Sequence, residues 1–229
     1  AFDEDAPLKM NWLLEIIRNL FQKSEFYQEE KKFTYKIKST IPSFNNFQKV
    51  THKKIKVFTK DYQSYCFKDF GIYIWRIDDE YFSIRCGPIG QNGIGGHSHY
   101  DQLSIECFTD NSWILRDPGT GTYTDDIATR NKFRSLDYHW GPKAKIQFPK
   151  EDEFDCFKLN YMGDGKVLQF DKYNFLGFAD FHGKRIYRKI EFNDGEVSIE
   201  DFSNSVDIQA YTSWGEENMG VKVKFSNGY

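Results

Sequence analysis

Hydrophobic residues at the start of the chain repeat at the three- and four-residue spacing of one helical face. Asp5 and Pro7 stand where an N-cap and a first-turn proline belong. The apolar positions are Leu8, Trp12, Leu13, Ile16, Ile17, Leu20 and Phe21. A lone helix with so apolar a face must bury it against a partner. The pattern therefore predicts an N-terminal helix that packs against further helices upstream of this sequence.

From about residue 33 onward, short apolar runs alternate with turn-forming residues. We expect strands at residues 55–58, 71–75, 81–86, 103–108, 113–115, 185–192, 197–202 and 221–225. The turns between them include Asp110-Asn111 and Asp194-Gly195, and the second is a strong hairpin signal. Because this spacing is typical of antiparallel hairpins in a sandwich or barrel, the chain is predicted to be mainly β.

Composition excludes several classes of function. Lys and Arg number 31 against 34 Asp and Glu, a formal net charge of -3, whereas a dedicated nucleic-acid binder usually carries a clear basic excess. No run of about 20 apolar residues occurs, so no membrane-spanning helix is expected. The four cysteines lie far apart and form no C-x-x-C pair, so we expect small buried hydrophobic residues rather than a metal site or disulfide framework.

One glycine-dense segment, residues 93–104, combines backbone freedom with histidine chemistry. It reads Gly-Ile-Gly-Gly-His-Ser-His-Tyr-Asp-Gln-Leu-Ser and leads directly into a predicted strand. Glycines let a backbone approach a ligand closely, and His97 and His99 would share one face of an extended segment. We interpret them as converging imidazoles of a functional site; the alternative is two loop histidines that bond to backbone groups.

Two later segments supply partners for these histidines. Residues 113–123 form an apolar strand that ends on Asp117 before Pro118-Gly119, where a carboxylate could ligate a metal or orient an imidazole. Residues 130–140 read Arg-Asn-Lys-Phe-Arg-Ser-Leu-Asp-Tyr-His-Trp and contain His139. The three segments together predict a site built from His97, His99, Asp117 and His139.

In this order the segments resemble the heparinase II/III-like family of bacterial polysaccharide lyases. The family pattern is Gly-His-x-His-x-Asp, a hydrophobic strand ending Asp-Pro-Gly, then Arg-Asn-x-Phe-Arg-Ser before a histidine, and the match is strongest from Gly71 to His139. The resemblance implies an antiparallel layered β-sandwich over residues 25–229, with residues 1–24 as the terminal helix of a largely missing α/α toroid domain. By analogy, it also implies a periplasmic or secreted protein.

The activity implied by the resemblance is β-elimination, a carbon–oxygen lyase reaction, on an acidic polysaccharide that contains uronic acid, such as a glycosaminoglycan. By family correspondence His97 and Tyr123 would be catalytic, neutralising charge and exchanging protons near the uronate. His99, Asp117 and His139 match positions that hold a structural zinc ion in some members, and another divalent metal could take its place. Since the toroid supplies further catalytic residues, we expect this chain alone to have little or no activity.

A second group of family-like residues could bind the polymer. It comprises Arg130, Asn131, Arg134 and Trp140. Arginine can bind a carboxylate through two parallel hydrogen bonds, and tryptophan can stack on a sugar ring. The alternatives are an ion-pair network that holds the loop for the arginines and core packing for Trp140.

The sequence departs from the family pattern in two places. Gly121 replaces the first of two tyrosines that are common after the Asp-Pro-Gly turn, and Trp140 stands where an asparagine is usual. Three other functions share features with this sequence. A cupin-like metal enzyme needs a glutamate four or five residues after its His-x-His, whereas Glu106 comes seven residues after His99. A non-catalytic carbohydrate-binding module and a degenerate family member that assembles surface polysaccharide stay open as alternatives.

Overall fold

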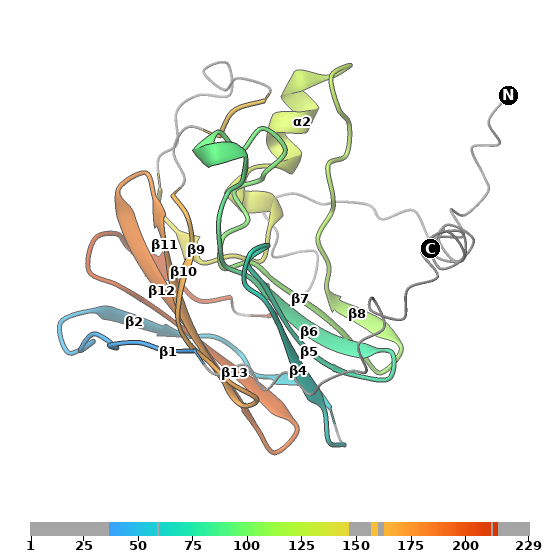
Figure 1. Cartoon of the computed structure of the whole chain (residues 1–229), viewed down its shortest axis with the longest axis vertical. Helices are drawn as coiled ribbons and strands as arrows, with labels where there is room; N and C mark the ends of the chain where they lie inside the picture. Colours follow the sequence, from blue (N-terminus) through green and yellow to red (C-terminus); the bar gives the residue numbers. More distant parts are fainter. Residues whose placement is uncertain (1–36, 59, 147–156, 160–162, 212, 215–229) are drawn as a thin grey trace, which may run out of the picture. The chain divides into compact units, whose positions relative to one another are not determined.

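Alternating apolar and polar positions build two antiparallel sheets that face each other (Figure 1). The computed structural model describes residues 37–58, 60–146, 157–159, 163–211 and 213–214, all within one compact unit, residues 34–229. The helix expected in residues 1–24 and the strand expected at residues 221–225 lie outside the described residues. Within the described part, no helix has the length and hydropathy of a membrane-spanning segment.

The smaller sheet is a five-stranded meander in which each strand pairs with the next one along the chain. Its strands are β4 (Gln63–Phe67), β5 (Ile72–Ile77), β6 (Glu80–Arg85), β7 (Ile105–Thr109) and β8 (Ser112–Leu115). Successive side chains of a strand point to opposite faces. Tyr73, Trp75, Phe82 and Ile84 are buried accordingly, while their neighbours are partly or fully exposed.

The larger sheet has seven strands in the order β1-β10-β11-β12-β13-β2, and β3 also pairs with β13. Its strands are β1 (Ile37–Lys38), β2 (Gln48–Thr51), β3 (Ile55–Lys56), β10 (Lys166–Phe170), β11 (Asn174–Phe181), β12 (Lys184–Asn193) and β13 (Glu196–Ser203). A separate two-stranded sheet pairs β9 (Lys143–Ala144) with β14 (Ile208–Gln209). Every pairing is antiparallel, so the predicted mainly β fold is confirmed.

Aromatic side chains form the core between the two sheets. The Trp75 ring lies 4.6 Å from the ring of Phe192 and 5.3 Å from that of Phe170, measured between centroids. These contacts join β5 to β12 and β10, which confirms the layered sandwich. Cys86 and Cys107 are free and buried against the same core, as expected for small hydrophobic residues, whereas Cys66 is free but only half-buried.

Two predicted hairpin turns are also confirmed. Asp194 and Gly195 join β12 to β13 with φ angles of 48° and 76°, and Asp110 and Asn111 join β7 to β8 with 50° and 56°. Positive φ at both central residues is the requirement of a type I′ turn, whose twist matches the flanking strands. These short turns hold the register of both hairpins.

The two connections that carry the predicted site leave the same end of the smaller sheet. One runs from β6 to β7 and contains the short helix η2 (Gln91–Gly93). The other runs from β8 to β9 and contains α2 (Ile127–Phe133) and η3 (Leu136–Tyr138). β7 starts where the antiparallel β8 ends. Both connections therefore lie at the same end of the sandwich, as α2 does in Figure 1.

We predict that Gly71→Ala lowers the free energy of unfolding by about 3 kcal/mol or more. Gly71 has a φ of 70°, and a Cβ there would lie 2.4 Å from the Cα of Gly87. Gly183→Ala is the matched control, because its φ is 74° but nothing lies within 4 Å of the added carbon. Denaturant unfolding should give a loss of only about 1 kcal/mol for the control. Equal losses in the two variants would show that the dihedral angle alone, and not the backbone contact, requires glycine.

Candidate functional site

An imidazole and a phenol form a hydrogen-bonded pair at the surface, at the end of the sandwich where the two connections lie. His97 Nδ1 and the Tyr123 hydroxyl are 2.5 Å apart, and their rings are stacked at a centroid distance of 6.0 Å. His97 is exposed, and 43% of the Tyr123 surface is exposed. The two residues predicted to be catalytic therefore touch each other, and solvent or a polymer can reach both.

Arg130 supports this pair from beneath. Its side chain is only 1% exposed, and Nη2 donates to the carbonyl of Gly96, the residue before His97. Its guanidinium lies 4.6 Å from the centre of the Tyr123 ring and 5.3 Å from that of Phe157. A guanidinium over an aromatic face is attracted to it, so Arg130 fixes the positions of both His97 and Tyr123.

A second group, formed by His99, His139 and Asp117, lies deeper. The rings of His99 and His139 are 5.2 Å apart between centroids. His139 Nδ1 lies 2.6 Å from Asp117 Oδ2, and the Asp117 carboxylate also accepts the amide of Gly119 at 2.8 Å. The structure thus brings together the three residues predicted to bind metal.

Burial and charge set the protonation preferences of this second group. Burial, with the neighbouring His139 charge, lowers the pKa of His99 to about 4. Burial alone would lower the pKa of His139 and raise that of Asp117, but their hydrogen bond and mutual attraction reverse both effects. The pKa of His139 is therefore raised and that of Asp117 lowered, as expected for an imidazolium–carboxylate pair beside a neutral His99.

The donor atoms suit zinc in kind, but their spacing is that of a hydrogen-bonded pair. Two zinc ligands in a tetrahedral site lie about 3.3 Å apart, whereas His139 Nδ1 and Asp117 Oδ2 are 2.6 Å apart. Among the described residues, no group of three or more His, Cys, Asp or Glu side chains is arranged to hold a metal ion. Within that same part, His139 Nε2 is buried without a hydrogen-bond partner. Zinc binding would require Asp117 and His139 to separate by less than 1 Å.

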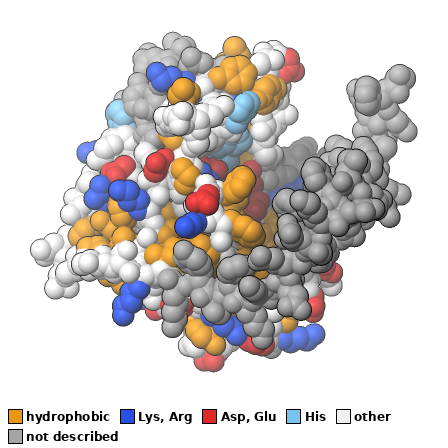
Figure 2. Space-filling model, in the orientation of Figure 1, with side chains coloured by type: hydrophobic (Ala, Val, Ile, Leu, Met, Phe, Trp, Pro, Cys, Tyr) orange, Lys and Arg blue, Asp and Glu red, His pale blue; other side chains and the backbone are white. Residues whose placement is uncertain are grey.

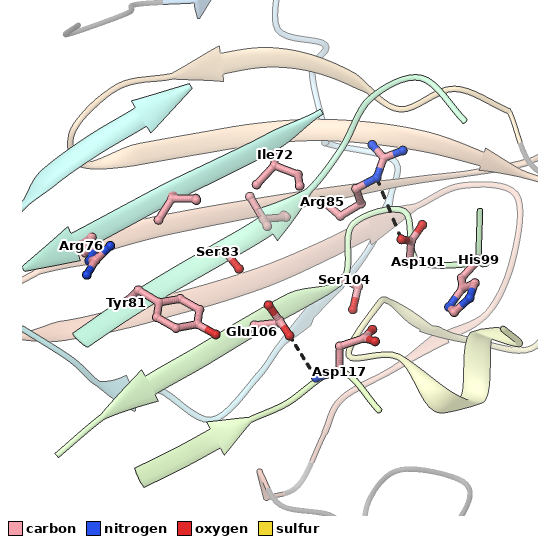
Figure 3. Close-up of a pocket in the computed structure, with 12 residues that line it drawn as sticks. Ile72, Arg76, Tyr81, Ser83, Arg85, His99, Asp101, Ser104, Glu106 and Asp117 are labelled. Atoms are coloured by element: carbon pink, nitrogen blue, oxygen red, sulfur yellow. Dashed lines mark hydrogen bonds and ion pairs between the residues drawn. The ribbon is translucent and has the colours of Figure 1, made fainter. Parts of the chain in front are cut away.

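An open cavity of about 590 Å³ adjoins this group on the outer face of the smaller sheet (Figure 3). Asp117 and His99 line one end, and the walls include Glu106, Asp101 and Arg85. Glu106 accepts the backbone amide of Asp117 at 3.1 Å and so holds the end of β8 in place. Burial raises the pKa of both Asp101 and Glu106. The sequence analysis did not assign these two carboxyl groups to the site, although Asp101 closes the His-x-His-x-Asp motif.

Gln102 is a further supporting residue that the sequence analysis missed. Its side chain is completely buried and clamps Gly87, donating to its carbonyl at 2.5 Å and accepting its amide at 3.1 Å. The clamp joins the two ends of the β6–β7 connection. On its other side, the same connection is tied to the end of α2, because Tyr100 N donates to the carbonyl of Arg134 at 2.8 Å. The histidine segment is thus held between the sheet and α2.

The four residues predicted to bind substrate are buried. Their exposed fractions are 1% for Arg130, 5% for Asn131, 1% for Arg134 and 2% for Trp140. Arg134 donates to the carbonyl of Lys158 at 3.3 Å, and Trp140 Nε1 donates to that of Arg116 at 3.2 Å. These placements favour the structural alternative for each side chain, in which it supports the loops instead of contacting a polymer.

The glycine that replaces a family tyrosine has a local explanation. Gly121 has a φ of 71°, and a Cβ there would lie 2.6 Å from ring atoms of Phe133 in α2. Asp126, the N-cap of α2, accepts the amide of Thr129 at 3.0 Å and fixes the start of that helix. The packing of α2 against the loop therefore leaves no room for a side chain at residue 121, while Tyr123 keeps its place.

Comparison with known proteins agrees with the motifs. Residues 59–139 match the family model described as Heparinase II/III-like, C-terminal. A solved heparinase III with methylated lysines is 16% identical, with a TM-score of 0.40, over 62% of this chain and 22% of that chain. No curated protein matches the sequence. This chain thus spans about a fifth of that heparinase III. Since the range 59–139 contains both histidine groups and Tyr123, the match confirms the resemblance for the part of the chain that carries the candidate site, and this part is similar to the C-terminal domain of heparinase II/III-like proteins.

Proposed function

We propose that this chain is part of an enzyme that cleaves uronic-acid-containing polysaccharide by β-elimination. The observation that supports the proposal best is the hydrogen-bonded pair of His97 and Tyr123. Two groups able to exchange protons are joined at the surface and held by a buried arginine. Such positioned pairs serve general acid–base catalysis.

In the proposed reaction a proton leaves the carbon beside the uronate carboxylate. Its electron pair forms the carbon–carbon double bond, the neighbouring C4–O bond breaks, and the released oxygen takes up a proton. Tyr123, after passing its own proton to His97 Nδ1, would accept the carbon-bound proton. The protonated His97 would neutralise the carboxylate, which stabilises the developing negative charge. Tyr123 then protonates the leaving oxygen and recovers its original proton from His97, so the pair ends unchanged.

The proposal includes a zinc ion held by His99, Asp117 and His139. Zinc takes two imidazoles and one carboxylate readily. Here it would join the β6–β7 connection to the β8–β9 connection and so keep the surface pair in register. No proton transfer in the proposed reaction passes through the metal.

Basic and acidic side chains are interspersed over the described part of the face in Figure 2. Long-range attraction of an acidic polymer needs an excess of positive charge on the protein surface. We therefore propose that polymer recognition depends on short-range contacts beside His97 and Tyr123, including contacts from a helical domain outside this chain.

The test is product analysis with the intact protein, N-terminal domain included. A panel of uronic-acid polysaccharides is incubated with the enzyme, and the same polymers with reduced carboxyl groups serve as controls. Elimination should give products with unsaturated uronate ends whose masses add up to that of the substrate. Products heavier by one water would show hydrolysis instead, and reaction of the reduced polymers would contradict a carboxylate-dependent elimination.

A non-catalytic carbohydrate-binding role is the second candidate. Tyr81, Phe108 and Trp113 form an aromatic cluster with ring distances of 5.5–6.4 Å, and Trp113 is 40% exposed. Exposed aromatic faces stack on sugar rings. Binding without new products, lost in Trp113→Ala but kept in His97→Ala, would favour this candidate. A degenerate member that assembles surface polysaccharide would likewise form no elimination products.

A further inference from the structure

One buried arginine of the larger sheet reaches both connections that form the site. Arg188, in β12, is fully buried. Its Nε and Nη2 donate to Asp201 Oδ1 and Oδ2 at 2.8 Å and 2.7 Å, forming a two-point ion pair with β13. Its Nη1 donates to the carbonyls of Leu103 and Trp140 at 2.6 Å and 2.7 Å. A single guanidinium therefore links two strands of one sheet to two loops above the other.

The two acceptor carbonyls belong to residues that closely follow His99 and His139 in the sequence. Leu103 comes four residues after His99, and Trp140 directly follows His139. Leu103 has a φ of 63°, a conformation that leucine rarely adopts unless its surroundings impose it. Its amide donates to the carbonyl of Arg85 at 2.7 Å, so the residue is held on both sides. Arg188 Nη1 thus bridges the segments that carry His99 and His139, which the Ile105 amide also joins through its 3.3 Å hydrogen bond to the Trp140 carbonyl.

Arg188 is itself held in one orientation. His52 Nδ1 accepts the amide of Tyr211 at 3.1 Å, so its proton is on Nε2, which donates to Asp201 Oδ2 at 2.8 Å. Burial would raise the pKa of Asp201, but the charge and hydrogen bonds of Arg188 hold it well below the usual range. The carboxylate stays ionised and fixes the guanidinium fork. Since the side chains of His52, Arg188 and Asp201 are all inaccessible, none of them can contact a polymer.

We infer that Arg188 is a positioning residue that sets the relative placement of His99 and His139 through the carbonyls of Leu103 and Trp140. Asp201 and His52 orient its guanidinium. This role goes beyond the proposed function, because it gives the larger sheet, outside residues 59–139, control over the site. It also holds whether or not the intact protein is a lyase.

The test compares two double variants of this chain in metal-free, histidine-labelled protein by NMR. Arg188→Met with Asp201→Asn removes the buried pair as a whole. Protein cores tolerate this change, because no lone buried charge is left behind. Arg185→Met with Asp180→Asn is the matched control, since it removes an exposed pair between β12 and β11. The chain has five histidines, so each imidazole can be followed.

In the buried-pair variant, the proton–proton cross-peak between the His99 and His139 rings should weaken about threefold, the effect of roughly 1 Å of added separation. The imidazole nitrogen shifts of both residues should move, while those of His182 should not. The control should leave the His99 and His139 signals unchanged. A folded buried-pair variant with wild-type His99 and His139 signals would overturn the inference, because Arg188 would then stabilise only the sheet.

Arg188→Lys provides a second measurement in case the double variant does not fold. Lysine keeps a positive charge beside Asp201 but cannot donate to the carboxylate and both carbonyls at once. It should change the His99 and His139 signals in the same direction as the double variant. Unchanged signals in the lysine variant, or failure of both variants to fold, would contradict a specific positioning role.

Discussion

Tyr123→Phe is expected to lower kcat of the intact enzyme by about 10²- to 10⁴-fold, the usual contribution of a positioned general acid or base. The substitution removes only the hydroxyl that pairs with His97. The ring keeps its contacts with Arg130 and Phe157, so the fold and the free energy of unfolding should not change. KM should change little, because the lost interaction belongs to the transition state.

His97→Ala should produce a loss of similar size, and the double variant should lose little more than the worse single variant. Groups that act as one proton-transfer unit are strongly non-additive. Independent, multiplying losses would show that His97 and Tyr123 serve separate steps.

Tyr173→Phe is the matched control, since Tyr173 is 53% exposed and lies between β10 and β11, away from the site. Steady-state rates of unsaturated-product formation provide the measurement. An undiminished kcat in Tyr123→Phe, with the control also active, would show that residues other than Tyr123 carry out the proton transfers.

The strands that sequence reasoning found are those with clear alternation and strong turns. Asp194-Gly195 and the apolar alternation of Arg185–Phe192 and Val197–Phe202 located β12 and β13. By contrast, β11 was missed, because Gly177 interrupts a run with apolar residues on both of its faces. The short β2 was missed because Gln48–Thr51 has a single apolar residue and is mostly exposed. Edge strands and doubly covered strands give little periodic signal.

The reacting groups were easier to predict than their supports. His97, His99, Asp117 and His139 stand in short motifs. The structure pairs His97 with Tyr123 and places His99, Asp117 and His139 together in a second group. Burial of Arg130, Arg134 and Trp140 could not be read from the same motifs, because an arginine or tryptophan in a loop can face either way. Arg188 and Asp201 come from strands far along the chain, where a buried charged pair has no local pattern. Their role depends on the packing of one sheet against the other.

Purified without chelators, the chain is expected to hold about one zinc ion and to lose it in both His99→Ala and Asp117→Ala. Removing one of three protein ligands usually leaves too few to retain the metal. Elemental analysis of the dialysed protein provides the measurement. His182→Ala and Asp79→Ala are matched controls, since both residues are exposed and lie in hairpin turns, His182 between β11 and β12 and Asp79 between β5 and β6. Both controls should keep the zinc of the wild type.

The result also decides what holds Asp117 and His139 together. Zinc bound to both would replace their 2.6 Å hydrogen bond, so the metal would carry the charge balance of the buried group. A wild-type protein without zinc would contradict the ligand assignment and leave an imidazolium–carboxylate pair as the structural link between the two connections. In that case Asp117→Asn should disturb the loops as strongly as Asp117→Ala, because an amide cannot balance an imidazolium charge. The surface pair would keep its proposed role in either case, since no proton transfer between His97 and Tyr123 requires the metal.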